Sequence, residues 1–347
     1  MLEGSLYQIT ERKDGEAQVR LLRESPVYAA HFPGYPVTPG VTLVQMALEL
    51  MDRRLTGVKN IKFLVPVQPS DTEPTFLRYR WKYPAPGRAE VEVLLADGTT
   101  LCARMSLEIA ADTVVLIPTY NNAGTVVEVV RRALGQGLPV LVVDDGCTDA
   151  TPDLLSGIDG ITVVRHPRNR GKGRALRTGF EKARELGYRQ VLTLDADGQH
   201  FPEDIPALLA RKGERNLVVG SRNIQAEGMA SSSTFANRFS NGTFRLLTGC
   251  SLPDTQTGFR LYPLDALPSL AVLSARYEAE VILLVFSAWK GLRLVPVPVR
   301  VAYPEDRVTH FRPGADFARI FVTYTVLFLL AVFYGYPRTF FRKLRAK

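Results

Sequence analysis

Two aspartates separated by one residue follow an apolar stretch in LTLDADGQHFPED (192–204). This spacing lets both carboxylates, Asp195 and Asp197, face one divalent cation that bridges a diphosphate. Hard oxygen ligands of this kind suit magnesium or manganese. Two anions at a strand end repel each other without a cation, so a metal site is the favoured interpretation. The alternative is a solvated acidic loop.

Three further segments have polar or basic residues where a strand or loop ends. VVLIPTYNN (114–122) ends in a turn, and VLVVDDGCTDAT (140–151) contains a double aspartate. A carboxylate at a strand end can bind a nucleotide base or ribose, although Asp-Asp-Gly is also ordinary turn chemistry. RHPRNRGKGRALRTGF (165–180) places cations and glycines at a helix start. That composition suits a phosphate site, or equally a solvated basic helix.

The elements that position these residues fall into two patterns. From Asp112 onward, short apolar strands alternate with amphipathic helices. Five strands that end in polar or glycine residues are expected, in TVVLIPTY, LPVLVVDDG, ITVVRHP, QVLTLDADG and NLVVGSR. This pattern predicts a mostly parallel, doubly wound α/β sheet with ligands at the carboxyl ends of its strands. Residues 1–111 instead predict one helix, 42–54, against several antiparallel strands, an α+β layer. Strands are expected at 76–83, 89–97 and 100–110. Two domains also agree with a length of 347 residues.

Composition limits the cellular setting. The chain has three cysteines without zinc-ligand spacing, so a reducing compartment is expected. The N-terminus lacks the basic and apolar regions of a secretory signal, which predicts a site facing the cytoplasm. The net charge is +8, and a basic cluster directly follows the most apolar stretch of the chain. This placement favours an anionic membrane surface over nucleic acid, with a solvated tail as the alternative. The cluster consists of Arg342, Lys343, Arg345 and Lys347.

The apolar stretch itself, IFVTYTVLFLLAVFYGYP (320–337), contains no charged residue. Its length reaches the lower edge of a bilayer span, but tyrosines and a basic tail also suit a helix lying in the interface. A buried core helix is the third possibility. We expect peripheral or monotopic attachment to the cytoplasmic side of the inner (plasma) membrane.

IPTYNN, VVDDGCTDAT, NRGKGRAL, DADGQH and GSRN occur in the order found in family 2 glycosyltransferases of GT-A fold, and the chain resembles that family over roughly 112–311. DTQTGFRLYP (254–263) and the segment 277–299 are similar to dolichyl- and polyprenyl-phosphate sugar transferases. The resemblance implies a nucleotide-sugar donor, a Mg²⁺ or Mn²⁺ cofactor and a catalytic Asp197. It implies a nucleotide pocket lined by Pro118, Tyr120, Asp145 and Lys172, with Asp195, Asp197 and Gln199 holding the metal and donor diphosphate. Arg222 and Arg260 match positions expected to meet phosphates, and Glu278 and Glu280 match the acceptor-side acidic pair.

The implied reaction is a single displacement at the anomeric carbon of the sugar, with the metal stabilising charge on the departing nucleoside diphosphate. A polyprenyl phosphate acceptor is already anionic and needs no general base. A hydroxyl acceptor requires a base. The sequence leaves the acceptor open.

HFPGYPVTPGVTLVQMALEL (31–50) resembles the active-site loop and central helix of hot-dog β-hydroxyacyl-acyl-carrier-protein dehydratases. The resemblance implies that His31 abstracts a proton and that the Gly40 amide polarises the thioester carbonyl. In that family the second catalytic residue is a carboxylate that acts from the partner subunit on the departing hydroxyl. Gln45 stands at this position, and glutamine can hydrogen-bond a hydroxyl but cannot protonate it. Glu49 lies one helical turn further along. The resemblance also implies an acyl-carrier-protein partner and a homodimer formed through this domain.

Together these features predict three parts: a hot-dog domain (1–111), a GT-A domain (112–315) and an apolar membrane-associating helix with a basic tail (316–347). The expected function is metal-dependent sugar transfer to a polyprenyl phosphate or to an acyl or polyene lipid, coupled to a dehydratase-like domain. The alternative is a single transferase whose hot-dog domain only dimerises or docks a carrier protein. A third possibility is a non-catalytic sugar-nucleotide-binding protein.

Overall fold

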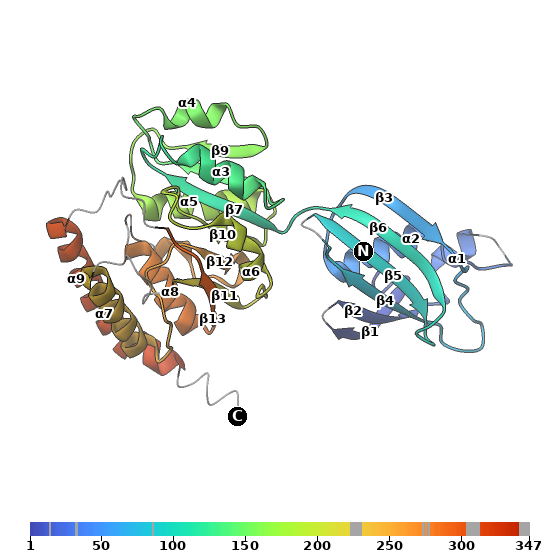
Figure 1. Cartoon of the computed structure of the whole chain (residues 1–347). Helices are drawn as coiled ribbons and strands as arrows, with labels where there is room; N and C mark the ends of the chain where they lie inside the picture. Colours follow the sequence, from blue (N-terminus) through green and yellow to red (C-terminus); the bar gives the residue numbers. More distant parts are fainter. Residues whose placement is uncertain are drawn as a thin grey trace. The chain divides into compact units, whose positions relative to one another are not determined.

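The computed structural model describes residues 1–13, 15–31, 34–84, 87–222, 231–272, 274, 276, 278–302 and 313–339. The chain divides into two compact units, Met1–Ala111 and Asp112–Lys347 (Figure 1). The first contains a six-stranded sheet and the second a seven-stranded sheet. Each unit therefore has a hydrophobic core of its own.

The N-terminal unit is an antiparallel sheet curved around one helix (Figure 1). The strand order β1-β2-β4-β5-β6-β3 has only antiparallel neighbours, and alternate residues such as Leu77 and Tyr79 are buried against the helix. This confirms the predicted α+β hot-dog fold. The strands are β1 (Tyr7–Lys13), β2 (Glu16–Leu21), β3 (Leu55–Phe63), β4 (Phe76–Lys82), β5 (Arg88–Leu95) and β6 (Leu101–Ile109).

The central helix is α2 (Gly40–Met51), which follows the short α1 (Pro26–Ala30). Its buried side chains include Leu43, Met46, Ala47 and Leu50, the spacing of one helical face. The predicted helix, 42–54, differs from α2 at both ends. α2 stops at Met51 because Asp52 adopts a left-handed conformation, with φ of 52°, which ends the helix.

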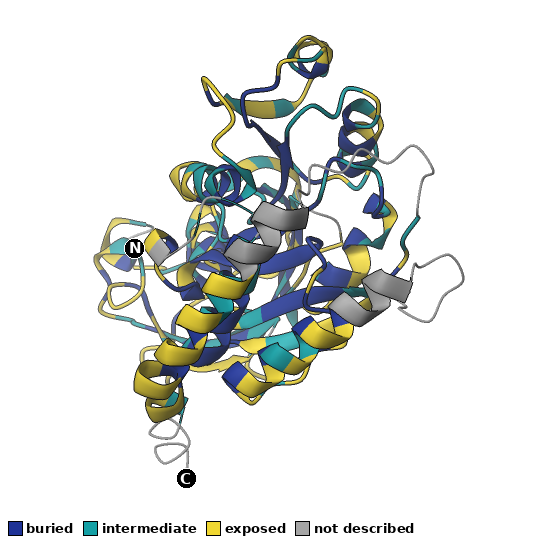
Figure 2. Ribbon diagram, turned by 90° about the vertical axis from the view of Figure 1, so that its left-hand side faces the viewer, coloured by how far each residue is buried: buried dark blue, intermediate teal, exposed yellow. Residues whose placement is uncertain are grey.

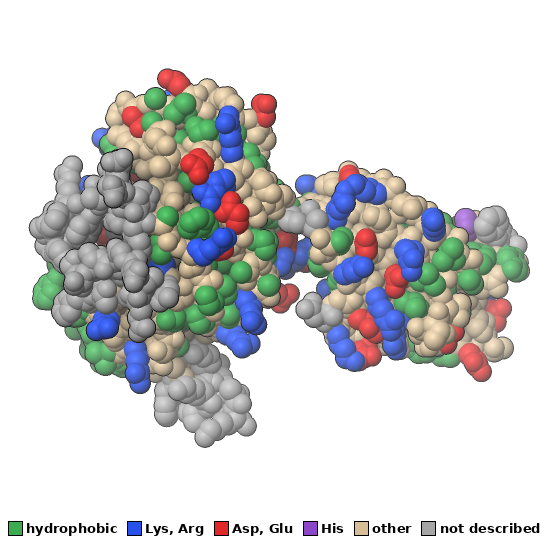
Figure 3. Space-filling view, in the orientation of Figure 1, with side chains coloured by type: hydrophobic (Ala, Val, Ile, Leu, Met, Phe, Trp, Pro, Cys, Tyr) green, Lys and Arg blue, Asp and Glu red, His purple; other side chains and the backbone are tan. Residues whose placement is uncertain are grey.

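Basic and acidic side chains are interspersed over the N-terminal unit (Figure 3). On the sheet face away from α2, Arg104 pairs with Glu92 at 2.7 Å and Lys82 pairs with Glu90 at 2.9 Å. These side chains are well exposed, so the pairs contribute little stability and the face is solvated.

The C-terminal unit has the order β13-β11-β12-β10-β7-β8-β9. Neighbours are parallel except β12, which is antiparallel to both β10 and β11. The expected mostly parallel α/β sheet is thus confirmed, although β12 and β13 were not among the predicted strands. The strands are β7 (Thr113–Thr119), β8 (Val140–Asp144), β9 (Ile161–Arg165), β10 (Gln190–Thr193), β11 (Asn216–Arg222), β12 (Arg260–Pro263) and β13 (Arg293–Val299).

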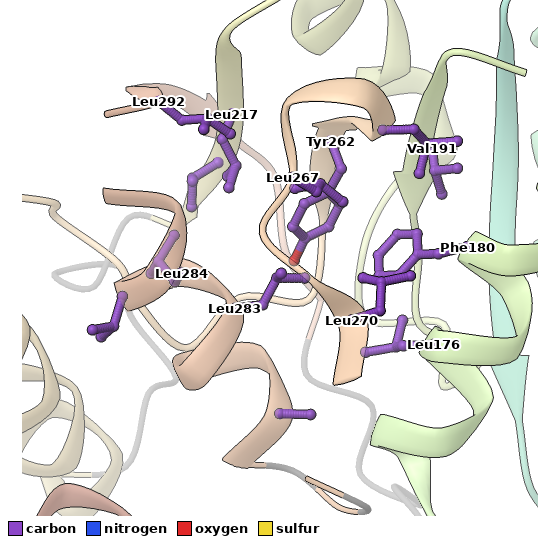
Figure 4. Packing of buried hydrophobic residues seen from close by; sticks show 14 of the residues in the cluster. Leu176, Phe180, Val191, Leu217, Tyr262, Leu267, Leu270, Leu283, Leu284 and Leu292 are labelled. Atoms are coloured by element: carbon purple, nitrogen blue, oxygen red, sulfur yellow. The ribbon is translucent and has the colours of Figure 1, made fainter. Parts of the chain in front are cut away.

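Helices cover both faces of this sheet, so its central strands are buried on both sides. Val115 and Ile117 pack in the core beside α3 (Val126–Leu134) and α6 (Ile205–Leu209). On the other face the Phe180 ring meets the edge of Tyr262 at 5.2 Å between centroids, beside Leu283 (Figure 4). These residues belong to α5 (Lys172–Glu185), β12 and α8 (Glu278–Lys290). Short helices are α4 (Thr151–Ser156), η1 (Pro202–Asp204), η2 (Leu264–Ala266) and η3 (Leu270–Val272).

Two long helices, α7 (Ser231–Thr248) and α9 (Pro313–Leu330), lie outside α8, and α9 continues through the π-helical η4 (Ala331–Gly335). Tyr336 donates a hydrogen bond from its hydroxyl to the Leu246 carbonyl at 2.8 Å. Gly335 packs on the Trp289 indole so closely that a Cβ would overlap it. The lack of a side chain at Gly335 therefore lets this helical extension dock.

The outer sides of α7 and α9 are exposed (Figure 2). Within the described residues, one helical segment, Phe321–Thr339, is long and apolar enough to cross a membrane, and 17% of it is buried. The alternative of a buried core helix therefore does not describe this segment. The basic cluster at 342–347 lies outside the described residues.

Candidate functional site

Strands β10, β7 and β8 are parallel neighbours, so their carboxyl ends meet at one edge of the sheet. Tyr120 follows β7 and is half-buried, whereas Pro118 is buried within that strand. Asp145 follows β8 and Asp195 follows β10. The fold thus brings these predicted site residues to the edge at which α/β sheets bind ligands.

The Asp145 carboxylate is buried and engaged by the protein itself. It contacts Nδ1 of His166 at 2.6 Å and accepts backbone N–H groups from Arg170 at 3.0 Å and Gly171 at 2.7 Å. A Cβ on the adjacent Gly146 would overlap the backbone of Arg168. Asp145 therefore fixes the loop before α5 from beneath.

Lys172, the first residue of α5, bridges two carboxylates. Its Nζ lies 2.7 Å from Oδ1 of Asp195 and 2.9 Å from Oε2 of Glu280. Burial lowers the pKa of Lys172, but the two carboxylates raise it by more, so the ammonium stays charged. Burial raises the pKa of Asp195, but Lys172, with a smaller contribution from Arg260, lowers it, and the net shift is downward. Both groups are ionised at neutral pH.

Asp197 and Gln199 form the turn after Asp195. The Gln199 backbone N–H donates to Oδ1 of Asp197 at 3.1 Å, and the side chain of Gln199 is buried. The following His200 is buried too, which lowers its pKa to about 4 and keeps its imidazole neutral at neutral pH. The predicted metal residues are thus brought together at one turn.

This turn fits a hard divalent cation. Among the described residues, no group of three or more His, Cys, Asp or Glu side chains could enclose a metal ion. Magnesium in phosphate-binding enzymes commonly takes only one or two carboxylates and completes its shell with water and substrate phosphates. Asp195 and Asp197, with the amide of Gln199, can supply such an open set of oxygens.

Arg222 and Arg260, the two predicted phosphate-binding arginines, both have partners within the protein. Arg222 forms a two-point pair with the fully buried Asp254, from Nε at 2.6 Å and Nη2 at 3.0 Å. Arg260 is fully buried and donates to the carbonyls of Glu280 at 2.9 Å and Thr255 at 2.8 Å. A direct phosphate contact would require Arg260 to leave these carbonyls.

Two residues that the sequence did not single out, Asp254 and His166, also hold the site together. Asp254 also accepts a hydrogen bond from Asn237 of α7 at 2.8 Å, so that it ties α7 to the end of β11. His166 likewise escaped notice, although it connects Asp145 to Thr178 of α5 at 3.0 Å. Both lie inside segments that stood out in the sequence, but their roles depend on contacts with distant residues.

A second candidate site lies on the N-terminal unit. His31 follows α1, and its backbone N–H donates to the Val27 carbonyl at 3.0 Å. Gly40 begins α2 directly under the Phe63 ring, where a Cβ would overlap the ring. Gln45 is exposed on α2 and donates from Nε2 to Glu49 at 3.0 Å. The structure thus places the predicted amide and glutamine on the first turns of one helix.

The Glu49 carboxylate accepts hydrogen bonds from residues near the N-terminus. It accepts the Leu2 backbone N–H at 2.8 Å and the Tyr7 hydroxyl at 3.1 Å, as well as the Gln45 amide. Burial raises the pKa of Glu49, but the hydrogen bonds from Gln45 and Leu2 lower it by more. Glu49 therefore remains ionised and is unsuited to act as an acid in place of Gln45.

Comparison with known proteins finds a different family match for each of the two units. Residues 114–269 match the family described as Glycosyl transferase family 2. Residues 8–85 match the family described as ApeI dehydratase. The first match spans β7 to η2 and so contains Asp145, Lys172 and the Asp195 turn. The second spans α1, α2 and the first four strands.

Three relatives align with this chain over most of their own length. An undecaprenyl-phosphate mannosyltransferase of Micrococcus luteus is 32% identical over 197 residues, which are 53% of this chain and 81% of the relative. A polyprenol monophosphomannose synthase of Mycolicibacterium smegmatis is 31% identical over 202 residues, 54% and 76% of the two chains. An uncharacterized protein of Methanocaldococcus jannaschii is 30% identical over 200 residues, 55% and 82%. Through its C-terminal unit, the chain therefore belongs to glycosyl transferase family 2.

Proposed function

We propose that residues 112–315 transfer a sugar from a nucleotide-sugar donor to a lipid acceptor, with Mg²⁺ or Mn²⁺ as cofactor. The observation that carries the proposal is the contact of Lys172 with Asp195 at the carboxyl ends of parallel strands, on the turn that also contains Asp197. The names of the Micrococcus and Mycolicibacterium relatives favour a polyprenyl phosphate as acceptor. An acyl or polyene lipid is the other acceptor class. Nucleic acid is not an expected partner.

Some of these residues would bind the donor, and others would hold the cation that neutralises its diphosphate. Asp145 fixes the loop before α5, so the N–H groups at the start of that helix and the Lys172 ammonium would supply hydrogen-bond donors for the diphosphate. Asp195, Asp197 and Gln199 would hold the cation, which stabilises negative charge on the leaving diphosphate. The acceptor oxygen forms a bond to the anomeric carbon as the bond to the diphosphate breaks. An acceptor phosphate is already anionic, so no general base is needed.

Thermal unfolding of the full chain with UDP- and GDP-sugars, with and without Mn²⁺, tests this proposal. We expect one nucleotide sugar to raise Tm by about 2–4 °C at saturation, only with Mn²⁺, because binding stabilises the folded state. Asp197→Ala should abolish the shift. Asp265→Ala is the matched control, since Asp265 is well exposed and only loosely paired with Arg189 at 3.5 Å. A panel without any shift would overturn the proposal.

Transfer itself is measured with the donor so identified and undecaprenyl phosphate in detergent. Formation of a labelled lipid that requires Mn²⁺ and disappears with excess EDTA is the expected result. Donor hydrolysis without lipid product would favour a different acceptor class. Binding with neither reaction would favour the non-catalytic alternative.

For the N-terminal unit we propose acyl-chain binding without dehydration. Gln45 cannot donate the proton that a departing hydroxyl needs, and Glu49 is held ionised by the start of the chain. His31 and Gly40 still suit the recognition of a thioester on an acyl carrier protein. This supports the single-transferase alternative over a bifunctional enzyme.

Restoring the acid tests this interpretation. Gln45→Glu should create measurable dehydration of a 3-hydroxyacyl thioester, because two adjacent carboxylates raise each other's pKa and favour a protonated acid. His31→Ala in the same background should remove the new activity. Dehydration by the wild-type chain would show instead that the unit is an active second enzyme.

Two features of assembly complete the proposal. The exposed β3 edge of the N-terminal sheet supports a homodimer formed through that unit. The exposed apolar side of α9 supports peripheral or monotopic attachment to the cytoplasmic side of the inner membrane.

A further inference from the structure

The Lys172 ammonium is held between side chains from two separate elements. Asp195 comes from the end of β10, and Glu280 comes from the first turn of α8. The approach of α5 to α8 depends on Gly173, where a Cβ would overlap the carbonyl of Ser274 and the side chain of Ala279. The contact is thus built by the packing of two helix starts.

The backbone of Glu280 is held by a separate contact. Its carbonyl accepts a hydrogen bond from the buried Arg260 at 2.9 Å, while its carboxylate contacts Lys172. Only 11% of the Glu280 side chain is exposed. The side chain is therefore held toward Lys172, although the family resemblance places this position on the acceptor side.

Asp195, Asp197, Glu280 and Lys172 form a cluster with more negative than positive charge. Asp195, Asp197 and Glu280 each contribute one negative charge, and Lys172 contributes one positive charge, so the sum is −2. A divalent cation at Asp195 competes with the ammonium for Oδ1, which lies 2.7 Å from Nζ. A lysine that left Asp195 without another partner would be a largely buried, uncompensated cation, which is costly. Glu280 supplies the partner that Lys172 keeps.

We propose that Glu280 is a positioning residue that retains Lys172 when Asp195 takes a divalent cation, and that it thereby sets the cation affinity of the site. Glu280 also keeps the ammonium beside the donor diphosphate after the exchange. The inference rests on the proposed function, because it assumes a cation at Asp195 and Asp197. It assigns Glu280 to the donor side of the reaction.

Binding of Mn²⁺ to the full chain without nucleotide, followed by the electron paramagnetic resonance signal of free Mn²⁺, tests the proposal. Glu280→Gln should weaken Mn²⁺ binding about tenfold, because Lys172 then competes with the metal without a second partner. Lys172→Met should strengthen it about tenfold by removing the competitor. The double variant Lys172→Met/Glu280→Gln restores the charge sum of −2 and should bind Mn²⁺ nearly as the wild type does.

Glu181→Gln is the charge-matched control. Glu181 lies on α5 but pairs with Arg177 at 2.8 Å and is about half exposed, so its loss should change Mn²⁺ affinity less than about twofold. Far-ultraviolet circular dichroism and Tm of each variant establish that it is folded. If Glu280→Gln does not fold, the double variant and Lys172→Met still decide the question.

Opposite effects of the two single substitutions support the inference, because a purely structural role would weaken binding in both. The inference is overturned if both single substitutions weaken Mn²⁺ binding, or if Glu280→Gln leaves Mn²⁺ binding unchanged. If the wild type binds Mn²⁺ and Asp197→Ala does not, such a failure concerns Glu280 alone. If the wild type binds no Mn²⁺ even with the nucleotide sugars, the cation requirement of the proposed function fails as well.

Discussion

At Asp145, a single carboxylate organises the loop that precedes α5. It receives His166 and two backbone N–H groups, from Arg170 and Gly171, that lie 25 and 26 residues away in sequence. Several hydrogen bonds to one carboxylate hold the backbone segments that donate them in a fixed position. Asp145 therefore holds the loop before α5 in place.

Replacing Asp145 by Asn tests this role. The amide has the same shape but no charge, and one of its two polar atoms is a donor that would face an N–H group. We expect the free energy of unfolding to fall by about 2–3 kcal/mol and nucleotide affinity to fall with it. Urea unfolding of the full chain, followed by fluorescence, measures the loss. Asp153→Asn, on the exposed side of α4, should change it by less than about 0.5 kcal/mol.

The sequence placed Asp195 and Asp197 correctly after an apolar strand, because a strand end can be recognised from local composition. It could not predict that Arg260 is buried or that Lys172 bridges to Glu280. Those facts depend on how α8 packs against α5, and the pair Lys172 and Glu280 is distant in sequence. Local patterns identify which residues could do chemistry, whereas tertiary packing decides which of them face a ligand.

Among the elements, the continuous helix formed by α9 and η4 has an inner side that packs against the protein and an outer side that is exposed. Leu327 and Ala331 are buried, whereas Leu329 is 58% and Phe333 80% exposed. Phe239 and Leu246 add exposed apolar side chains from α7. A surface of this kind on two neighbouring helices is suited to insertion at a lipid interface.

The double variant Leu329→Asp/Phe333→Asp tests the lipid-binding role of α9. Two charges on the outer side should reduce partitioning to phosphatidylglycerol-containing vesicles by at least about tenfold, because each must be hydrated at the interface. Both side chains point away from the core, so folding should be retained. Vesicle co-sedimentation measures the effect, with Leu154→Asp on α4 as control. Equal sedimentation of all variants would assign attachment to another surface.

The strands of the C-terminal unit show which elements can be predicted from local sequence. The five predicted strands of the C-terminal unit are apolar runs that end in polar or glycine residues, and each contains an observed strand, β7 to β11. β12 has four residues, and β13 contains two prolines in RLVPVPV, so neither has a strong local pattern. Their pairing is long-range, since antiparallel β12 lies between β10 and β11.

For the whole molecule, the decisive feature is the β3 edge of the N-terminal sheet. Within the described residues, β3 has nine residues, pairs with β6 alone and is one of the two edge strands of this sheet, with β1 at the other edge. Val58 and Phe63 on this strand are exposed, and Leu64 and Val65 continue the apolar surface. A long edge strand with exposed apolar residues is a template for pairing with another chain. A two-fold dimer through β3 removes the edge in both copies.

Sedimentation equilibrium of the full chain should give about twice the monomer mass of 38.5 kDa. Val58→Glu should weaken the dimer by at least about tenfold, because a two-fold axis places the new charge in the interface twice, opposite its own copy. Val163→Glu is the matched control, since Val163 is an exposed residue on β9, the edge strand of the other sheet. If Val163→Glu dissociates the dimer and Val58→Glu does not, association proceeds through the transferase unit. The acyl-binding sites would then act independently in each chain, because the family's second catalytic position would no longer meet His31 of another copy.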